Sequence, residues 1–207
     1  MSELDDFERA QQLKEFWAKY GRWIVLSSVL FIGLIFFWVF YQNNSSKNRM
    51  EAADLQQKIA VAITQKNDNE LSKLLETART DFRHNEMILV AGFLESAKFY
   101  FDNNKLDDAA KALLWVKDNV KDGAVKAIAT LRLSSVYLEQ KKFDEAINVL
   151  NQDKVPEAFQ ALFYEQKGDV YLANHMKDEA KQAYSDAIEV LGDQVPLILK
   201  LKLNTIQ

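Results

Sequence analysis

The sequence predicts an all-α protein, with an N-terminal transmembrane helix followed by a solenoid of helical hairpins. Three observations carry this prediction. A long apolar run without a charge lies near the N-terminus, only 6 glycines and 2 prolines occur in 207 residues, and the second half repeats a spacing of small, aromatic and apolar residues. So few turn-forming residues favour long helices joined by short turns over a many-stranded β protein.

The first element is a transmembrane helix over residues 23–41, which read WIVLSSVLFIGLIFFWVFY. These residues carry no charge, and as a helix they are about 28 Å long, close to the hydrocarbon thickness of a bilayer. Trp23 at one end, and Trp38 and Tyr41 at the other, are placed as interfacial aromatic residues. A buried core helix and a cleaved signal peptide are the alternatives. The long uncharged run disfavours the first, and the lack of a small-residue cleavage site disfavours the second.

Basic residues on either side of this segment predict its orientation. Four precede it and three follow it closely, namely Arg9, Lys14, Lys19 and Arg22 before it and Lys47, Arg49 and Lys58 after it. Cytoplasmic flanks carry the excess of lysine and arginine. This small difference predicts a cytoplasmic N-terminus and places the domain over residues 42–207 on the opposite side of the membrane.

Residues 1–22 are predicted to form a cytoplasmic amphipathic segment. Their apolar side chains recur every three or four residues and would share one helical face: Phe7, Ala10, Leu13, Trp17 and Tyr20. Such a helix lies on a membrane surface or docks on a partner. The alternative is a simple extension of the membrane helix.

The region after about residue 87 contains three copies of a helix-turn-helix unit. Three tyrosines are each followed nine residues later by an alanine: Tyr100 by Ala109, Tyr137 by Ala146, and Tyr171 by Ala180. A small residue lies three before each tyrosine (Ala97, Ser134, Gly168), and a large apolar residue lies four after each alanine (Leu113, Leu150, Tyr184). The small residues let paired helices approach closely, and each hairpin leaves a face for the next to cover. We therefore expect repeats at 87–117, 124–150 and 159–191.

Less regular elements flank the three repeats. Residues 48–81 are predicted to form a helical pair whose apolar stripe includes Ala53, and residues 196–205 a closing helix. Atypical terminal repeats are expected as caps of a solenoid. Gly192 and Pro196 are suitable stop and restart signals before the closing helix.

Composition and motifs predict no catalytic residue, no cofactor and no metal site, and hence no enzyme. The chain has no cysteine, and its two histidines, His84 and His175, fall in predicted turns. The sequence contains no metal-binding, nucleophile or phosphate-loop motif. Acidic pairs are expected just before each second helix (Asp107 and Asp108, Asp144 and Glu145, Asp178 and Glu179), where they would cap backbone amides and favour the helix dipole. A net charge of −4 gives no reason to expect nucleic acid as a partner.

The repeat spacing resembles the tetratricopeptide repeat, and the third copy, GDVYLANHMKDEAKQAYSDAI, matches it best. Two departures occur: Phe93, Thr130 and Tyr164 replace the tryptophan usual early in the first helix, and the usual proline at the repeat end is absent. The whole plan, with the run KAIATLRLSSVYLEQKKFDEAINVL and the ending LKLKLNTIQ, resembles the YfgM-type ancillary subunits of the SecYEG translocon.

This resemblance implies a single-pass protein of the inner membrane of Gram-negative bacteria, with a periplasmic tetratricopeptide-like domain. It implies association with SecYEG and with the membrane-anchored prolyl isomerase PpiD, and transfer of exported polypeptides toward periplasmic chaperones. A link to an envelope stress-response regulator is also implied. The alternative is a scaffold for another envelope assembly, in outer-membrane biogenesis or division, which shares every sequence feature except the resemblance.

A solenoid without chemistry acts through its surface, and the first helices of stacked hairpins line a concave face. Counting from the small residue of each repeat gives nine candidate partner-binding residues: Leu94, Lys98, Phe101, Leu131, Ser135, Leu138, Glu165, Asp169 and Leu172. This set is mixed, so we expect an apolar segment as ligand and not an acidic tail. Phe101 and Leu138 come last in their helices and are expected to reach the groove, whereas ordinary inter-repeat core is the alternative for each leucine.

Overall fold

The computed structural model describes residues 2–81, 86–151 and 154–206. Every regular element in these ranges is a helix, so the predicted all-α fold class is confirmed. His84 lies outside the described residues. The chain divides into two compact units, Met1–Arg49 and Met50–Gln207.

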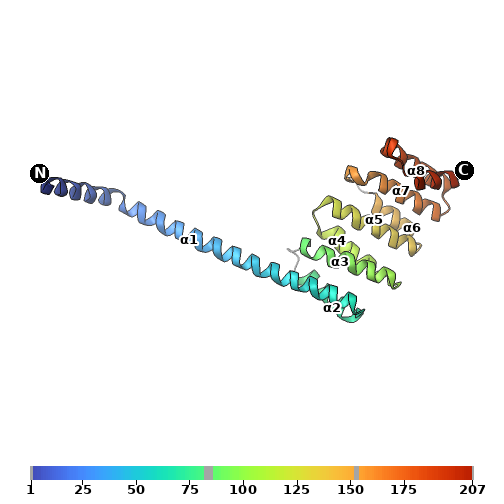
Figure 1. Ribbon diagram of the computed structural model, residues 1–207, viewed down its shortest axis with the longest axis horizontal. Helices are drawn as coiled ribbons and strands as arrows, with labels where there is room; N and C mark the ends of the chain where they lie inside the picture. The colour runs from blue at the N-terminus through green and yellow to red at the C-terminus, as the bar shows by residue number, and fades with distance from the viewer. Residues whose placement is uncertain (1, 82–85, 152–153, 207) are drawn as a thin grey trace. The chain divides into compact units, whose positions relative to one another are not determined.

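The first unit is formed by the N-terminal part of helix α1, which extends over Ser2–Thr64 (Figure 1). Within α1, Phe16–Val39 is long and apolar enough to cross a membrane, judged by length and composition. This stretch overlaps the predicted span over residues 23–39. Its described large apolar side chains are exposed, with Phe36 at 72% and Leu30 at 68%. Exposed apolar side chains suit lipid and are unfavourable in water, which argues against the buried core helix.

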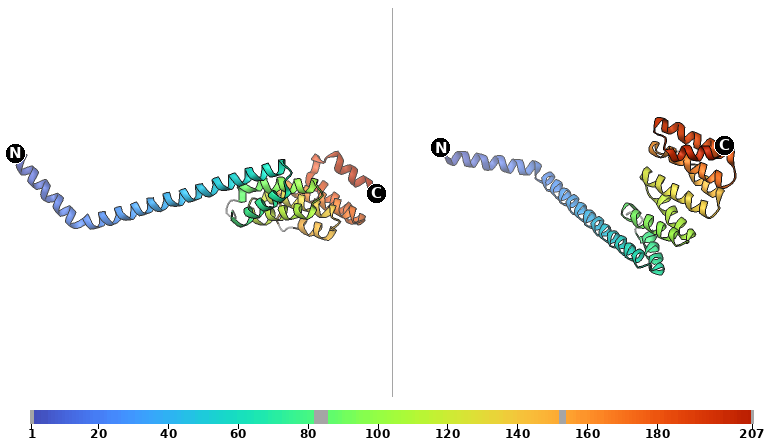
Figure 2. Two further views of the ribbon diagram at one scale, coloured as in Figure 1. Left: turned by 90° about the horizontal axis from the view of Figure 1, so that it is seen from below. Right: turned by 45° about the vertical axis from the view of Figure 1, so that its right-hand side comes forward.

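The second unit is a stack of helical hairpins. The bounds of its further elements are α2 Asp68–Asp81, α3 Glu86–Asp102, α4 Leu106–Asn119, α5 Gly123–Glu139, α6 Phe143–Leu150, α7 Glu157–Ala173, α8 Lys177–Leu191, a 3-10 turn at Gly192–Gln194, and α9 Leu197–Thr205. Figures 1 and 2 show α3 beside α4, α5 beside α6 and α7 beside α8 as successive pairs. Each pair packs on the next, because α4 contacts α5, α6 contacts α7 and α8 contacts α9.

The first helix of the N-terminal pair does not begin anew near residue 48. Residues 42–47, QNNSSK, are helical and belong to α1. No glycine or proline occurs between residues 34 and 64, and asparagine and serine each cost a helix less than about 0.7 kcal/mol. A short polar stretch is therefore too weak a signal to end a helix.

The two helices of each of the three repeats are joined by the same turn. Asn104, Lys141 and His175 adopt positive φ values of 58°, 58° and 63°. The amide after each of them donates to the carbonyl of the repeat tyrosine, from Lys105 to Tyr100 at 2.8 Å, from Lys142 to Tyr137 at 2.8 Å, and from Met176 to Tyr171 at 2.9 Å. A left-handed residue after a helix satisfies its last free carbonyls in this way. The polar turns FDNNKLDD, LEQKKFDE and LANHMKDE thus share one backbone conformation.

The N-terminal pair has this turn too, although its sequence lacks the repeat signature. Lys66 has a φ of 53°, and the amide of Asn67 donates to the carbonyl of Ala62 at 2.9 Å. Ala62 therefore stands where the repeats have tyrosine, and Leu71 stands where they have alanine. Both are buried, at 3% and 0% exposure. The small and large residues have exchanged helices, which explains why the sequence pattern does not find this hairpin.

The repeat alanines, predicted to lie where paired helices approach closely, are buried. Ala109, Ala146 and Ala180 are each 0% exposed. In the third repeat a Cβ atom on Gly168 would lie 2.4 Å from the ring of Tyr184, a distance that real Cβ atoms do not show. Glycine is required there because the tyrosine ring occupies the space of a side chain.

The acidic pairs do not cap their helices as expected. The N-cap positions of α4, α6 and α8 are Lys105, Lys142 and Met176, and none makes a side-chain capping bond. The carboxylates lie inside the first turn, where the helix dipole favours them. Asp107 also accepts a hydrogen bond from Gln140 Nε2 at 2.8 Å, which links the turns of consecutive hairpins. An ion pair between Lys105 and Asp68 links the turns one hairpin earlier.

The buried apolar side chains form three clusters. The largest extends from Leu55 to Val136 over α1 to α5. A small one, Ala127, Leu150 and Phe163, joins α5, α6 and α7. The third gathers residues of α7, α8 and α9 around Tyr184 and Leu199. Consecutive hairpins thus bury one another's faces, as a solenoid requires.

Candidate partner-binding surface

The nine predicted surface residues all lie on first helices of the hairpins, three each on α3, α5 and α7. Each helix presents them at three before, one after and four after the small residue of its repeat. The structure distributes them between an open cavity, the hairpin cores and the contact with the closing helix.

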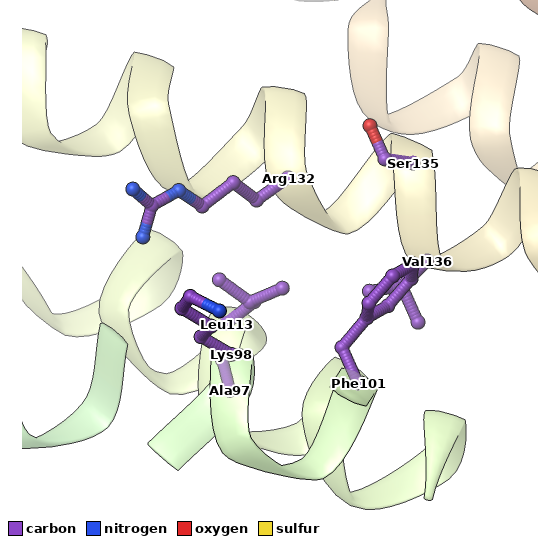
Figure 3. A pocket seen from close by; sticks show the side chains of 7 residues that line it. All are labelled: Ala97, Lys98, Phe101, Leu113, Arg132, Ser135 and Val136. Carbon is purple, nitrogen blue, oxygen red and sulfur yellow. The ribbon is translucent and has the colours of Figure 1, made fainter. Parts of the chain in front are cut away.

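Three of the nine come together at one cavity, between α3 and α5. Lys98, Phe101 and Ser135 line it, and its volume is about 270 Å³. Four further residues complete the lining: Ala97, Leu113, Arg132 and Val136 (Figure 3). The positions one and four residues after the small residue of α3 thus face the next first helix along the stack.

The cavity combines an apolar floor with two cations. Leu113 is 1% exposed and Val136 is 3% exposed, whereas Phe101 is 38% exposed and forms a wall. Figure 3 shows Phe101 against Val136, with the Arg132 guanidinium on the opposite side of the cavity. The Lys98 ammonium pairs with Asp102 at 2.6 Å along the exposed face of α3.

The polar groups of the lining differ in how they are satisfied. The Ser135 hydroxyl donates to the carbonyl of Leu131 at 3.1 Å, within its own helix. The Arg132 guanidinium has no ion pair or hydrogen bond with any residue that the structure describes. Arg132 is therefore the charge at this cavity that a ligand can neutralise.

Three of the predicted leucines contribute to packing. Leu94 packs against the large cluster, Leu131 against the small one, and Leu172 against the cluster around Tyr184. Leu138 is half-buried and is not among the residues described for any cluster. Phe101 and Leu138 are thus the apolar candidates whose side chains are not assigned to core.

The two carboxylates of the third repeat are occupied by the closing helix. The Lys202 ammonium on α9 lies 2.8 Å from the carboxylate of Glu165 and 2.8 Å from that of Asp169. Asp169 also accepts a hydrogen bond of 2.7 Å from the Tyr184 hydroxyl. Glu165, Asp169 and Tyr184 therefore hold α9 against the last hairpin.

The pKa shifts reflect this network. Burial lowers the pKa of Lys202, but its hydrogen bonds to Asp169 and Glu165 and the negative charges of these carboxylates together raise it by more, so the net shift is upward. Burial raises the pKa of Tyr184, and the hydrogen bond to Asp169 raises it further. Both groups stay protonated well above neutral pH, which keeps the network intact.

Sequence reasoning missed two residues at these surfaces. Arg132 lies two positions before the small residue of its repeat, outside the three positions that were counted. Lys202 sits in the alternating run LKLKL, where a helix with Leu199 and Leu203 inward places it beside the carboxylates. Only the packing of α9 reveals this pairing.

Comparison with known proteins defines first the class and then the family. The family model described as a tetratricopeptide repeat-like domain matches residues 14–207, so this is a tetratricopeptide repeat-like protein with an N-terminal helix apolar enough to cross a membrane. An ancillary SecYEG translocon subunit of Neisseria gonorrhoeae is 30% identical over 207 residues, covering 99% of this chain and 98% of the relative. The chain belongs to the family of ancillary SecYEG translocon subunits.

More distant relatives carry the same name. That of Haemophilus influenzae is 23% identical, with 98% of both chains covered. That of Escherichia coli is 23% identical, with 96% of this chain and 95% of the relative covered. No solved structure matches the chain.

Proposed function

We propose that this protein is an ancillary subunit of the SecYEG translocon, a membrane-anchored interaction module without enzymatic activity. The observation that carries the proposal is the similarity, over nearly the whole chain, to relatives of that name. The architecture supports it, because an apolar helix precedes a solenoid whose surface offers a groove but no recognised catalytic motif.

The proposal includes a location and an orientation. Residues 1–22 are cytoplasmic, residues 23–41 cross the inner membrane, and residues 42–207 form the periplasmic domain. The basic residues flanking the span favour this orientation by their small excess on the N-terminal side. In this arrangement the solenoid stands where exported polypeptides leave the translocon.

The partners beyond SecYEG are the membrane-anchored prolyl isomerase PpiD, exported polypeptides and periplasmic chaperones. A tethered solenoid without chemistry can act between them only by binding. Of the nine candidate residues, Phe101 and Leu138 are the apolar ones outside the described clusters. We therefore assign contact with polypeptides to the concave face around these two side chains.

Purification of the full-length protein from membranes in mild detergent tests the translocon assignment. SecYEG subunits are the expected co-purifying proteins, with PpiD in the same fraction. Recovery of an outer-membrane biogenesis or division complex instead, or of a stress-response regulator alone, would favour the alternative functions and contradict this one.

The groove is tested by Phe101→Ala combined with Leu138→Ala. We expect unchanged thermal stability and reduced recovery of polypeptide partners, because these side chains are not core. Leu162→Ala, at an exposed leucine on α7 that is not a candidate, is the matched control. A loss of about 2–5 kcal/mol in stability would instead identify the two residues as core.

A further inference from the structure

The closing helix shows how a helix docks beside a first helix of this solenoid. On α9, Leu199 is fully buried and Leu203 packs beside it, while the Lys202 ammonium reaches two carboxylates of α7. One of these, Asp169, is the residue immediately after the small residue of its repeat. The contact therefore combines packing of apolar side chains with an ion pair.

The equivalent position on α3 has the opposite charge. Lys98 follows Ala97 as Asp169 follows Gly168, and the helix that packs next along the stack, α5, contributes Arg132 to the same cavity. Between α7 and α9, the Lys202 ammonium thus meets two carboxylates. Between α3 and α5, two cations, Lys98 and Arg132, line the same cavity. Lys98 is neutralised by Asp102 on its own helix, which leaves Arg132 without a carboxylate among the described residues.

The cavity also has room for a side chain. Its volume of about 270 Å³ is below the range of about 300–1,000 Å³ for sites of drug-sized molecules, and suits one or two side chains of a peptide. Its floor of Ala97, Leu113 and Val136 is apolar, and Phe101 offers an exposed ring at the wall. The planar guanidinium of Arg132 is suited to bidentate binding of a carboxylate.

We propose that the cavity between α3 and α5 binds a segment of a partner protein in which a large apolar residue neighbours an aspartate or glutamate. The apolar side chain lies on Phe101, Leu113 and Val136, and the carboxylate pairs with Arg132. The ligand is mainly apolar with a single acid, not an acidic tail. This inference deepens the proposed function, on which it rests, by naming the chemistry that the groove selects.

Selection from a displayed library of short random peptides on the full-length chain in lipid nanodiscs tests this chemistry. We expect enrichment of peptides with an acid beside a large apolar residue. A selected peptide should bind about tenfold more tightly than the same peptide with glutamine or asparagine in place of the acid, as expected for a charge-assisted bidentate contact. Fluorescence anisotropy of the labelled peptides measures this ratio.

Variants at Arg132 test whether the preference for the acidic peptide arises at this cavity. Arg132→Gln should abolish the preference for the acid, Arg132→Lys should retain part of it, and Arg132→Glu should transfer it to a peptide with lysine at that place. Lys181→Gln, at an exposed position on α8, is the charge-matched control and should leave the ratio unchanged. Arg132 is exposed, so the melting temperature of each variant should stay near that of the wild type.

Three results of the peptide experiments would overturn the inference: selection of peptides without acid enrichment, failure to select any peptide, or an acid preference that survives Arg132→Gln. Concentration-dependent self-association that competes with the peptide would instead make a second copy of the chain the occupant, and would also overturn it. Co-purification with SecYEG is read separately. Retained SecYEG with no acid preference refutes only this inference, whereas loss of SecYEG refutes the proposed function.

Discussion

At the scale of single residues, the contact between Gly168 and Tyr184 determines how closely α7 and α8 approach. Alanine in place of glycine favours a helix by about 1 kcal/mol. A Cβ atom on Gly168, however, would lie 2.4 Å from a ring that is fully buried, and such overpacking costs about 1–3 kcal/mol. We expect Gly168→Ala to lower the melting temperature of the full-length protein in detergent, measured by circular dichroism.

Gly123→Ala provides the control for this prediction. Gly123 begins α5, and a Cβ atom there would lie 3.4 Å from Pro156, which is ordinary contact. This variant should keep or raise the melting temperature. A gain of stability in Gly168→Ala equal to that in Gly123→Ala would show that the helices do not approach as described.

The left-handed turn residues carry strain that glycine would relieve. Lys141 has a φ of 58°, a conformation that costs an L-residue about 1–2 kcal/mol, whereas glycine adopts it freely but loses more entropy on folding. We expect Lys141→Gly to raise stability by up to about 1 kcal/mol in a urea titration. Lys142→Gly, at a φ of −89°, should give no gain, and equal gains at both positions would contradict the explanation.

At the scale of elements, the repeat alanines set the spacing of each helix pair. Ala146 and Ala180 are both 0% exposed, so leucine at either position must displace its neighbours at a cost of about 1–3 kcal/mol. Ala173→Leu, at the exposed end of α7, should change stability little. Unaltered melting temperatures for both Ala146→Leu and Ala180→Leu would refute the pairing of these helices.

The closing helix should loosen at alkaline pH. The folded-state pKa of Lys202 is raised from 10.5 and that of Tyr184 from 10.0. A raised folded pKa gives stability that is fully present below the unfolded pKa and is lost as pH rises through the folded pKa. We therefore expect the free energy of unfolding to begin to fall above about pH 10, with α9 amides exchanging first in hydrogen-exchange measurements.

A double variant isolates the network. Lys202→Met with Tyr184→Phe removes both titrating groups of the network and should reduce the alkaline fall in stability, although it lowers stability at neutral pH by leaving Glu165 and Asp169 without their partners. Lys200→Met, at an exposed position of the same helix, should leave the curve unchanged. An alkaline fall of equal size in the double variant would place its origin elsewhere.

The three repeats could be predicted from the sequence, whereas the N-terminal hairpin could be predicted only in part. The spacing of Tyr171 and Ala180 predicted a hairpin because burial and close approach impose residue size. The N-terminal hairpin was visible only as an apolar stripe, since Ala62 and Leu71 exchange sizes, and Ala53 proved exposed beside the buried Ala52. Adjacent alanines cannot be distinguished by composition, because a helix rotates by about 100° per residue.

The surface was less predictable than the core. Counting from the small residue found Lys98 and Phe101 at the cavity, because position on a helix fixes direction. It missed Arg132, which comes from the neighbouring helix, and it could not foresee that Lys202 occupies the third-repeat carboxylates. Contacts between distant segments depend on how helices stack, which no local pattern records.

At the scale of the whole molecule, a helix long and apolar enough to cross a membrane precedes a solenoid with its own buried core, so the first is suited to lipid and the second to water. We expect a reporter that is active only in the periplasm to function when fused after Gln207. Protease added to spheroplasts should remove residues after about Lys47. Protection of these residues, with activity of a reporter that works only in the cytoplasm, would reverse the orientation that the few flanking charges favour.

The separation of the buried side chains into three clusters bears on how the chain is made. All residues of the cluster from Leu55 to Val136 are synthesised before α7, and the cluster around Tyr184 contains the residues that are synthesised last. Because contacts in a solenoid are local in sequence, folding can follow synthesis without waiting for the C-terminus. A nascent chain that has reached α6 already contains every residue that lines the cavity between α3 and α5, so this surface can form before synthesis of the protein is finished.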